Sequence, residues 1–357
     1  MKQDLQSTLT FPWGEELPEF GQRHRVGPGV YWLRLPLPFA LDHINVWLLE
    51  DEINGQKGWT LVDTGVALDE QKAIWRQLFD SGFDGLPILR VLVTHMHPDH
   101  VGLAGWLCRH WQVPLWMSMT DYMMACVWVR PPTDEHSVGH VGQATASFFQ
   151  RHGFTDETML KEIRQRDNYY PGLVSPLPAE YVRLMHADKI RIGGHVWEVI
   201  VGYGHAPEHV SLWCPEKNIF ISGDMILPRI STNVSVHAYE PEANPLTLYL
   251  DSLARYAHID KKALVLPSHG RPFVGLHERI RQQHEHHAER LKETYHACKQ
   301  QPGFTAAQLV PIMFRRSLDA HQMTFAMGEA IAHLHTLYYK GRLVRRLEDG
   351  VYRFYAH

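Results

Sequence analysis

The sequence predicts an α/β protein of the α+β kind, in which two mixed β-sheets pack on each other between helices. Short apolar segments that end in turn residues alternate with amphipathic helical segments, which is the pattern of sheets flanked by helices. The chain has 357 residues, of which 45% are hydrophobic, so it can bury the cores of two domains of unequal size. A long polar stretch interrupts the alternation, and a helix-rich segment ends the chain.

The first strands are expected within residues 29–65, where GVYWLRLP, INVWLLED and WTLVDTG follow one another as an antiparallel meander. Residues 69–81 place Ile74, Leu78 and Phe79 on one helical face, and the apolar strand ILRVLVT comes directly after them. A second cycle gives a helix, the strand VPLWMS and, much later, strands around HVWEVIVGYGH, VSLWCP and NIFISGD. The alternation therefore predicts one mixed sheet packed on another.

A helical insertion and a C-terminal module complete the predicted organisation. The stretch at about residues 120–183 is longer than a connection needs to be and is punctuated by Pro and Gly, so we expect a helical cap inserted into a catalytic domain of residues 1–275. Residues 276–357 are expected to form a helical, winged-helix-like domain. Its last two strands would turn at Asp349 and Gly350 as the wing.

Composition narrows the class of protein. There are 35 Lys and Arg against 39 Asp and Glu, which argues against a protein that holds nucleic acid through bulk charge. Four cysteines without a CxxC pair fit buried thiols in a reducing compartment. The first residues contain no continuous apolar segment of a signal peptide, and no run of eighteen uncharged apolar residues occurs. We therefore expect a cytoplasmic protein that does not enter a membrane.

The segment HMHPDH supplies four candidate metal ligands within six residues, directly after an apolar strand: His95, His97, Asp99 and His100. Imidazole nitrogen and carboxylate oxygen are ligands of divalent zinc, and alternate side chains of one sharp loop can serve two adjacent ions. Three later segments repeat the context of a strand end followed by a polar ligand and a small residue. They are GYGHAPEH at His205, FISGD at Asp224 and LVLPSHG at His269.

In this order, LVDTG, THMHPDH, GHAPEH, SGD and SHG resemble the five signature motifs of the metallo-β-lactamase superfamily, over a scaffold of about residues 29–275. The resemblance implies an αββα sandwich and two divalent metal ions, most simply Zn²⁺, with Fe or Mn as alternatives. It assigns His95, His97 and His205 to one metal, Asp99, His100 and His269 to the other, and Asp224 to a bridge between them.

Two carboxylates carry further expected roles. Asp99 is the residue expected to orient the attacking water or to pass its proton onward. The resemblance implies that Asp63, in the LVDTG loop, fixes a ligand or a loop from behind without binding metal. The alternative for Asp63 is an ordinary turn cap before Gly65.

The first function hypothesis is hydrolysis of a small-molecule thioester, lactone or ester by a hydroxide that bridges the two ions. Asp224 resembles the bridging carboxylate of the glyoxalase II and lactonase branches. An iron-dependent oxygenase and a metal-bound sensor without turnover are further alternatives, and a homodimer stays open.

The second hypothesis is a single-stranded RNA endonuclease, because a branch with a winged-helix-like end resembles this organisation. Phosphate contacts would then come from basic residues near the end of the chain: Arg315, Arg316, Lys340, Arg342, Arg345 and Arg346.

Two further segments have ordinary interpretations. His284, His286 and His287 are expected on the solvated flank of a helix whose apolar line is set by other residues. The Met-rich and aromatic residues of 116–129 are expected to be core, with an apolar substrate wall as the alternative.

Overall fold

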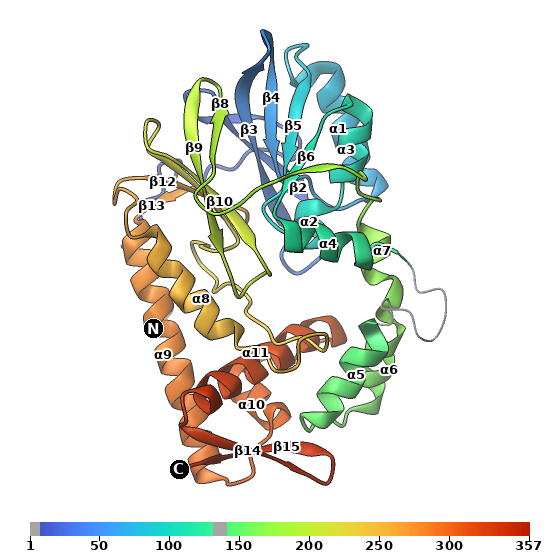
Figure 1. Ribbon diagram of the computed structural model, residues 1–357, viewed down its shortest axis with the longest axis vertical. Coiled ribbons are helices and arrows are strands. Elements are labelled where there is room, and N and C mark those ends of the chain that lie inside the picture. Colours follow the sequence, from blue (N-terminus) through green and yellow to red (C-terminus); the bar gives the residue numbers. More distant parts are fainter. Residues whose placement is uncertain (1–7, 131–140) are drawn as a thin grey trace. The chain divides into compact units, whose positions relative to one another are not determined.

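The computed structural model describes residues 8–130 and 141–357, and these form two compact units (Figure 1). Among the described residues, the first unit contains 8–130, 170–232 and 253–280, and the second contains 141–169, 233–252 and 281–357. Each unit is thus assembled from separate stretches of chain. The single sequence-based boundary at 275 stays a prediction, and residues 131–140 of the expected insertion lie outside the described part.

The first unit contains a seven-stranded mixed sheet. Strands β1 to β4 pair antiparallel in sequence order, as the predicted meander requires, and β5, β6 and β7 then add in parallel. The strands are β1 (His24–Gly27), β2 (Val30–Pro36), β3 (His43–Ile53), β4 (Gln56–Val62), β5 (Ile88–Leu92), β6 (Leu115–Met117) and β7 (Tyr181–Arg183).

A six-stranded sheet packs against the first one and has the order β13-β12-β11-β10-β9-β8. All its pairs are antiparallel except β11 with β12. Its strands are β8 (Lys189–Ile192), β9 (His195–Gly202), β10 (His209–Cys214), β11 (Ile219–Gly223), β12 (Leu264–Pro267) and β13 (Phe273–Val274). The predicted pair of mixed sheets is therefore confirmed.

The core of this unit lies between the two sheets. Trp32 and Trp47 of the first sheet are fully buried and stack with their ring centroids 6.3 Å apart. They belong to one apolar cluster with Val199 and Leu212 of the second sheet. Burying a large apolar side chain contributes about 1.5–3 kcal/mol, so this cluster holds the sheets face to face.

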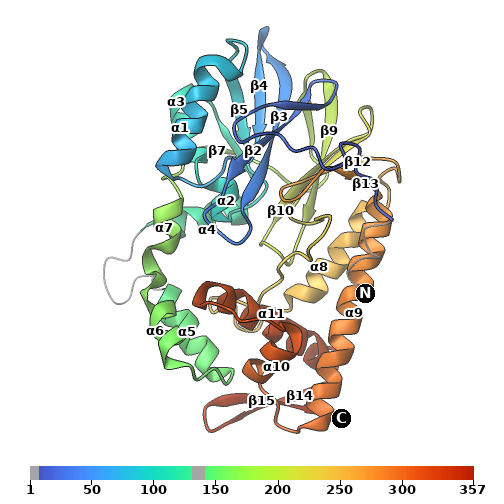
Figure 2. The ribbon, with the colours of Figure 1, turned by 180° about the vertical axis from the view of Figure 1, so that it is seen from behind.

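Helices cover the outer faces of the sandwich. Helix α1 (Asp69–Gln77) and helix α3 (Ala104–Trp111) lie on the outer side of the first sheet in both views (Figures 1 and 2). Trp75 of α1 is buried, and its indole N–H donates to the Thr64 carbonyl at 3.1 Å. On the second sheet, the Tyr256 ring of the short helix Ala254–Tyr256 lies 5.0 Å from the Phe220 ring of β11.

In the described part of the predicted insertion, residues 120–130 and 141–173 contain helices, and strand β7 lies at its end. Helix α4 (Met119–Trp128) and most of α7 (Tyr169–Leu173) belong to the first unit, whereas α5 (Val141–Arg151) and α6 (Glu157–Arg164) belong to the second. A short helix, α2 (Pro98–Val101), comes after the loop that follows β5 and starts with a proline, whose fixed backbone angle suits the first helical turn.

The second unit also contains the C-terminal helices and a hairpin. Its helices are α8 (Pro245–Leu253), most of α9 (Leu276–Gln300), α10 (Ala306–Met313) and α11 (Ala320–Tyr339). The hairpin pairs β14 (Leu343–Glu348) with β15 (Val351–Ala356). Asp349 and Gly350 turn with φ of 50° and 78°, which is the conformation a tight hairpin turn needs. The predicted turn is confirmed, and the winged-helix assignment stays a prediction.

The expectation that His287 is solvated is wrong, although His284 is exposed as expected. Helix α9 buries a polar face that contains Gln283, His287 and Thr294, and none of these is more than 1% exposed. The Nδ1 atom of His287 lies 3.4 Å from Nε2 of His333 on α11. Burial lowers the pKa of His287 to about 2 and that of His333 to about 4, so both are neutral.

No helix in residues 8–130 and 141–357 is both long enough and apolar enough to cross a membrane.

Candidate metal centre

The structure brings all seven sequence-predicted ligands to one edge of the sandwich, each on a loop that follows a strand. His95 to His100 come after β5, and His205 lies between β9 and β10. Asp224 follows β11 directly, and His269 comes two residues after β12. Within the described ranges, three groups of ligand atoms lie within 4.8 Å of one another: His95, His97 and His205; His95, His100 and Asp224; and Asp99, His100 and His269.

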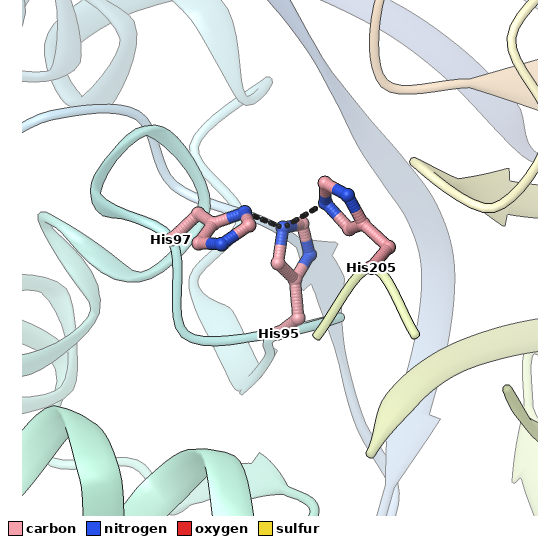
Figure 3. Close-up of side chains that lie close together, drawn as sticks. All are labelled: His95, His97 and His205. Atoms are coloured by element: carbon pink, nitrogen blue, oxygen red, sulfur yellow. Dashed lines mark hydrogen bonds between the residues drawn. The ribbon is translucent and has the colours of Figure 1, made fainter. Parts of the chain in front are cut away.

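The first group is three imidazole rings that converge from two loops (Figure 3). Nε2 of His95 lies 2.9 Å from Nδ1 of His97 and 3.1 Å from Nε2 of His205. Nitrogen ligands about 2.0–2.1 Å from a tetrahedral zinc ion are separated by roughly 3.3 Å. The three nitrogens are therefore spaced as the ligands of one ion.

The second group joins a carboxylate to two rings. Oδ2 of Asp99 lies 3.5 Å from Nε2 of His100 and 3.3 Å from Nε2 of His269. Asp224 faces both groups, because its Oδ2 lies 3.3 Å from Nε2 of His205 and 3.6 Å from Nε2 of His100, while its Oδ1 lies 3.4 Å from Nε2 of His269. This position suits a carboxylate that bridges two ions.

The chemistry of the donor set fits metal ions. Nε2 of His100 and Oδ1 of Asp224 are buried and form no hydrogen bond with any described group. Buried polar atoms are nearly always satisfied, and a cation within reach would satisfy both. Five imidazoles and two carboxylates suit zinc and also suit iron, so the residues support a site for two metal ions without selecting the metal.

The protein groups also set the charge of the centre. Burial opposes ionisation of Asp99, but the neighbouring His100 and His269 rings outweigh it and hold the pKa of this carboxyl well below its usual range. Burial also opposes a charge on His269, yet Asp224 and Asp99 raise its pKa to about 10. This part of the site therefore favours positive charge, which a divalent ion can supply in place of the ring protons.

Asp63 lies behind the ligands and is fully buried. Its Oδ1 accepts the backbone N–H of Thr94 at 2.8 Å, and its Oδ2 lies 2.8 Å from Nδ1 of His100. A carboxylate on Nδ1 fixes the tautomer and directs Nε2 to the metal position. The geometry supports the expected role of Asp63 in fixing a ligand, because its carboxylate contacts His100, which is a candidate ligand, and Thr94.

Two residues of β3, His43 and Asn45, support the site and were not predicted from the sequence. The carbonyl of His43 lies 2.8 Å from Nδ1 of His269 and accepts its hydrogen bond, which leaves Nε2 free for a metal. The side-chain amide of Asn45 donates to the carbonyls of Pro267 and Gly270, each at 2.8 Å, on either side of His269. In the sequence, Asn45 stands out as the one amide within the apolar segment INVWLLED.

His209 holds the loop of Asp224. Its Nε2 accepts the backbone N–H of Asp224 at 3.0 Å, and the ring is fully buried. Gly223 has a φ of 55°, and a Cβ at this position would lie 2.4 Å from the His209 ring. The SGD motif therefore needs glycine for both backbone conformation and space. His209 is the last residue of the GHAPEH segment.

Comparisons with known proteins agree with this geometry. Residues 40–269 match the model of the metallo-beta-lactamase superfamily, and residues 291–357 match the metallo-beta-lactamase-like C-terminal domain. A Bacillus subtilis (strain 168) protein named probable metallo-hydrolase YqjP is 24% identical over 313 residues, which are 85% of this chain and 91% of that protein. A second protein of that organism, named probable metallo-hydrolase YflN, is 23% identical over 59% of this chain and 72% of its own.

Among solved structures, a beta-lactamase domain protein from Burkholderia ambifaria is 50% identical, with a TM-score of 0.92 over 99% of both chains. The metallo-beta-lactamase family protein TTHA1429 from Thermus thermophilus is 26% identical, with a TM-score of 0.75 over 93% of this chain and 100% of its own. The chain belongs to the metallo-beta-lactamase superfamily. Its class within that superfamily is that of the metal-dependent hydrolases.

Proposed function

We propose that the chain hydrolyses a carbonyl ester-type bond of a small molecule, namely a thioester, lactone or ester, at a centre of two divalent metal ions. The observation that carries the proposal is the position of Asp224, whose two oxygens face the ring nitrogens of both ligand groups. His95, His97 and His205 would hold one ion, and Asp99, His100 and His269 the other. We propose zinc, and iron or manganese are the alternatives.

Bound together, two such ions supply Lewis acidity and lower the pKa of a coordinated water to roughly 7. The chain's own residues direct this chemistry. Asp99 is held ionised, so it can accept a hydrogen bond from the attacking water and point its oxygen at the carbonyl carbon. The same carboxylate can pass the proton to the departing alcohol or thiol as the C–O or C–S bond breaks.

Exposure indicates the side from which a substrate enters. The Asp99 side chain is 17% exposed and that of Asp224 is 10% exposed, whereas that of His100 is completely buried. Asp63 and Thr94 close the buried side with their mutual hydrogen bonds. We therefore place the substrate on the Asp99 side of the centre.

Helix α4 offers an apolar surface for the rest of the substrate. Met117, Tyr122 and Ala125 are buried, as the core interpretation of this segment expects. The core interpretation is wrong for Met119, Met123 and Val127, which are 39%, 51% and 42% exposed. These side chains are spaced four residues apart along α4 and form an exposed apolar stripe.

The first turn of α4 touches the loop of His205, since the N–H of Thr120 donates to the Glu208 carboxylate at 3.0 Å. We propose that the exposed stripe of Met119, Met123 and Val127 contacts an apolar acyl or aromatic group of the substrate.

Cleavage of single-stranded RNA is the second candidate, and it requires the winged-helix-like end as a phosphate-binding surface. Arg345, one of the proposed phosphate contacts, is 2.6 Å from the Glu242 carboxylate and lies 4.8 Å from the rings of both Tyr338 and Tyr352. An arginine held in this way is less available to phosphate. Arg315, Arg316 and Lys340 are exposed and keep the candidate open.

The test compares purified protein of known metal content with its Asp99→Ala variant on acyl thioesters, lactones, phosphodiesters and single-stranded RNA. We expect turnover of one carbonyl ester class, lost in the variant. Asp69→Ala is a control, because Asp69 is an exposed carboxylate on α1 that pairs with Lys72. Cleavage of RNA alone would replace the proposal with the second candidate. Two bound metals without turnover of any class would favour a sensor, and oxygen consumption with iron would favour an oxygenase.

A further inference from the structure

The two peptide groups that flank Met96 are each held by a residue of the segment 120–183. Met96 lies between the candidate ligands His95 and His97, and it is 1% exposed. Its backbone N–H donates to Oδ1 of Asp121 at 2.9 Å, and its carbonyl accepts the hydroxyl of Tyr170 at 2.6 Å. Asp121 is in the first turn of α4, and Tyr170 is in α7.

The second oxygen of Asp121 reaches a different loop. Its Oδ2 accepts the backbone N–H of Glu208 at 2.7 Å and the hydroxyl of Ser118 at 3.3 Å. Glu208 comes three residues after His205, and its own carboxylate accepts the N–H of Thr120 at 3.0 Å. Asp121 is completely buried. One carboxylate therefore joins the two loops that carry all three ligands of the first group.

These contacts set the direction of ligand side chains. The peptide between His95 and Met96 carries the N–H that Asp121 holds, and the peptide between Met96 and His97 carries the carbonyl that Tyr170 holds, so a rotation of either peptide moves a ligand ring. A metal site needs its ligands within about 0.5 Å of the productive geometry, held by supporting hydrogen bonds. Asp121 forms its hydrogen bonds with Met96, Ser118 and Glu208, and none of these residues belongs to the second ligand group.

We propose that Asp121, assisted by Tyr170, is a positioning residue for the metal ion of the first group. The inserted segment then holds the loops that carry the ligands of this group. The inference rests on the proposed function for the presence of metal. Asp121→Asn keeps the size of the side chain but offers one acceptor oxygen where two are used. Its amide would face a backbone N–H, so one of the two loops loses its hydrogen bond.

The experiment measures metal binding without turnover. Wild type, Asp121→Asn and Tyr170→Phe are stripped with a chelator and titrated with Co²⁺, and the visible spectrum and the stoichiometry are recorded. We expect two sites in the wild type, and in Asp121→Asn a 10- to 100-fold lower affinity at one of them, with the other unchanged. The spectrum of Asp121→Asn at one equivalent should match that of His97→Ala. Tyr170→Phe should weaken the same site, by a smaller factor.

Asp51→Asn is the matched control, because Asp51 is another buried aspartate of the first unit that accepts two backbone N–H groups, from Glu52 and Gly193, each at 2.9 Å. It should lower thermal stability and leave both metal affinities unchanged. Wild-type affinities in Asp121→Asn, or equal weakening of both sites, would overturn the positioning role alone. A wild-type chain that binds no metal would overturn the proposed function and this inference with it. If Asp121→Asn does not fold, Tyr170→Phe decides, and wild-type affinities in that variant would overturn the inference.

Discussion

Replacing Asp63 by asparagine should weaken metal binding at the site of His100. The carboxylate accepts the Thr94 N–H and hydroxyl and lies 2.8 Å from Nδ1 of His100. A hydrogen bond to a charged group contributes about 1.5–3 kcal/mol, and mutation of a residue that orients a ligand costs about 10- to 100-fold in metal affinity. These two estimates agree, since a factor of 10–100 is about 1.4–2.7 kcal/mol.

The assay is competition with a chromophoric chelator at fixed pH, on protein whose folding is checked by circular dichroism. We expect the dissociation constant at the site of His100 to rise by that factor in Asp63→Asn. The site of His95, His97 and His205 should change less, because Asp63 reaches it only through the Thr94 hydroxyl, which lies 3.0 Å from Nδ1 of His95. Asp51→Asn, a buried aspartate paired with Arg90 at 2.7 Å, should change stability without changing either constant. Unchanged metal affinity in a folded Asp63→Asn variant would refute the reasoning.

Three further predictions concern metal removal, acid and backbone conformation. Stripping both ions should lower the melting temperature, because each ion present at 100 times its dissociation constant stabilises the fold by about 2.7 kcal/mol; an unchanged melting curve would contradict a site formed in the folded state. The stability contributed by His287 and His333 should fall between pH 7 and pH 5. Burial lowers their pKa values in the folded chain, where both stay neutral, while the unfolded chain takes up protons below about pH 6.5. Each should cost about 2 kcal/mol at pH 5. Burial raises the pKa of Glu329 to about 7 and that of Asp121 to about 6, so these two carboxyl groups change stability in the opposite direction. Urea titrations of wild type and of a variant with both His287→Gln and His333→Gln at the two pH values isolate the histidine contribution, and an equal change of stability with pH in the two proteins would contradict it. Gly223→Ala should destabilise the fold and weaken metal binding, because its Cβ would lie 2.4 Å from the His209 ring, whereas Gly194→Ala, with a φ of 81° but open space, should affect stability alone.

The alternation of apolar strands and helices predicted the sandwich, and the resemblance of five ordered motifs to those of the metallo-β-lactamase superfamily predicted that seven residues meet in one centre. Apolar strands that end in His or Asp have a direct structural meaning, since strand ends carry the loops of a site. The burial of His287 could not be predicted in this way. Helix α9 buries a polar face, and its neighbours on other helices, such as His333, are distant in sequence.

The residues that support the ligands were harder to predict, for a physical reason. His43 acts through its backbone carbonyl, and Asp121 acts on the backbone N–H groups of Met96 and Glu208. Every residue except proline has such an N–H and every residue has the carbonyl, so the partner leaves no mark in the sequence. Asn45 carried a visible signal as a polar residue within an apolar strand, and Asp63 was expected from the LVDTG motif.

The side-chain amide of Asn45 connects the two sheets and so affects the separation of the two ligand groups. It accepts the indole N–H of Trp32 in the middle of one sheet, and it donates to two carbonyls of the loop that ends a strand of the other sheet. A sliding movement between the sheets would have to break the two bonds to these carbonyls, while the bond from Trp32 holds the amide within its own sheet. The spacing of the two ligand groups is thereby tied to the register of the two sheets at Asn45, so a shift of one sheet against the other at this point would move the loop of His269.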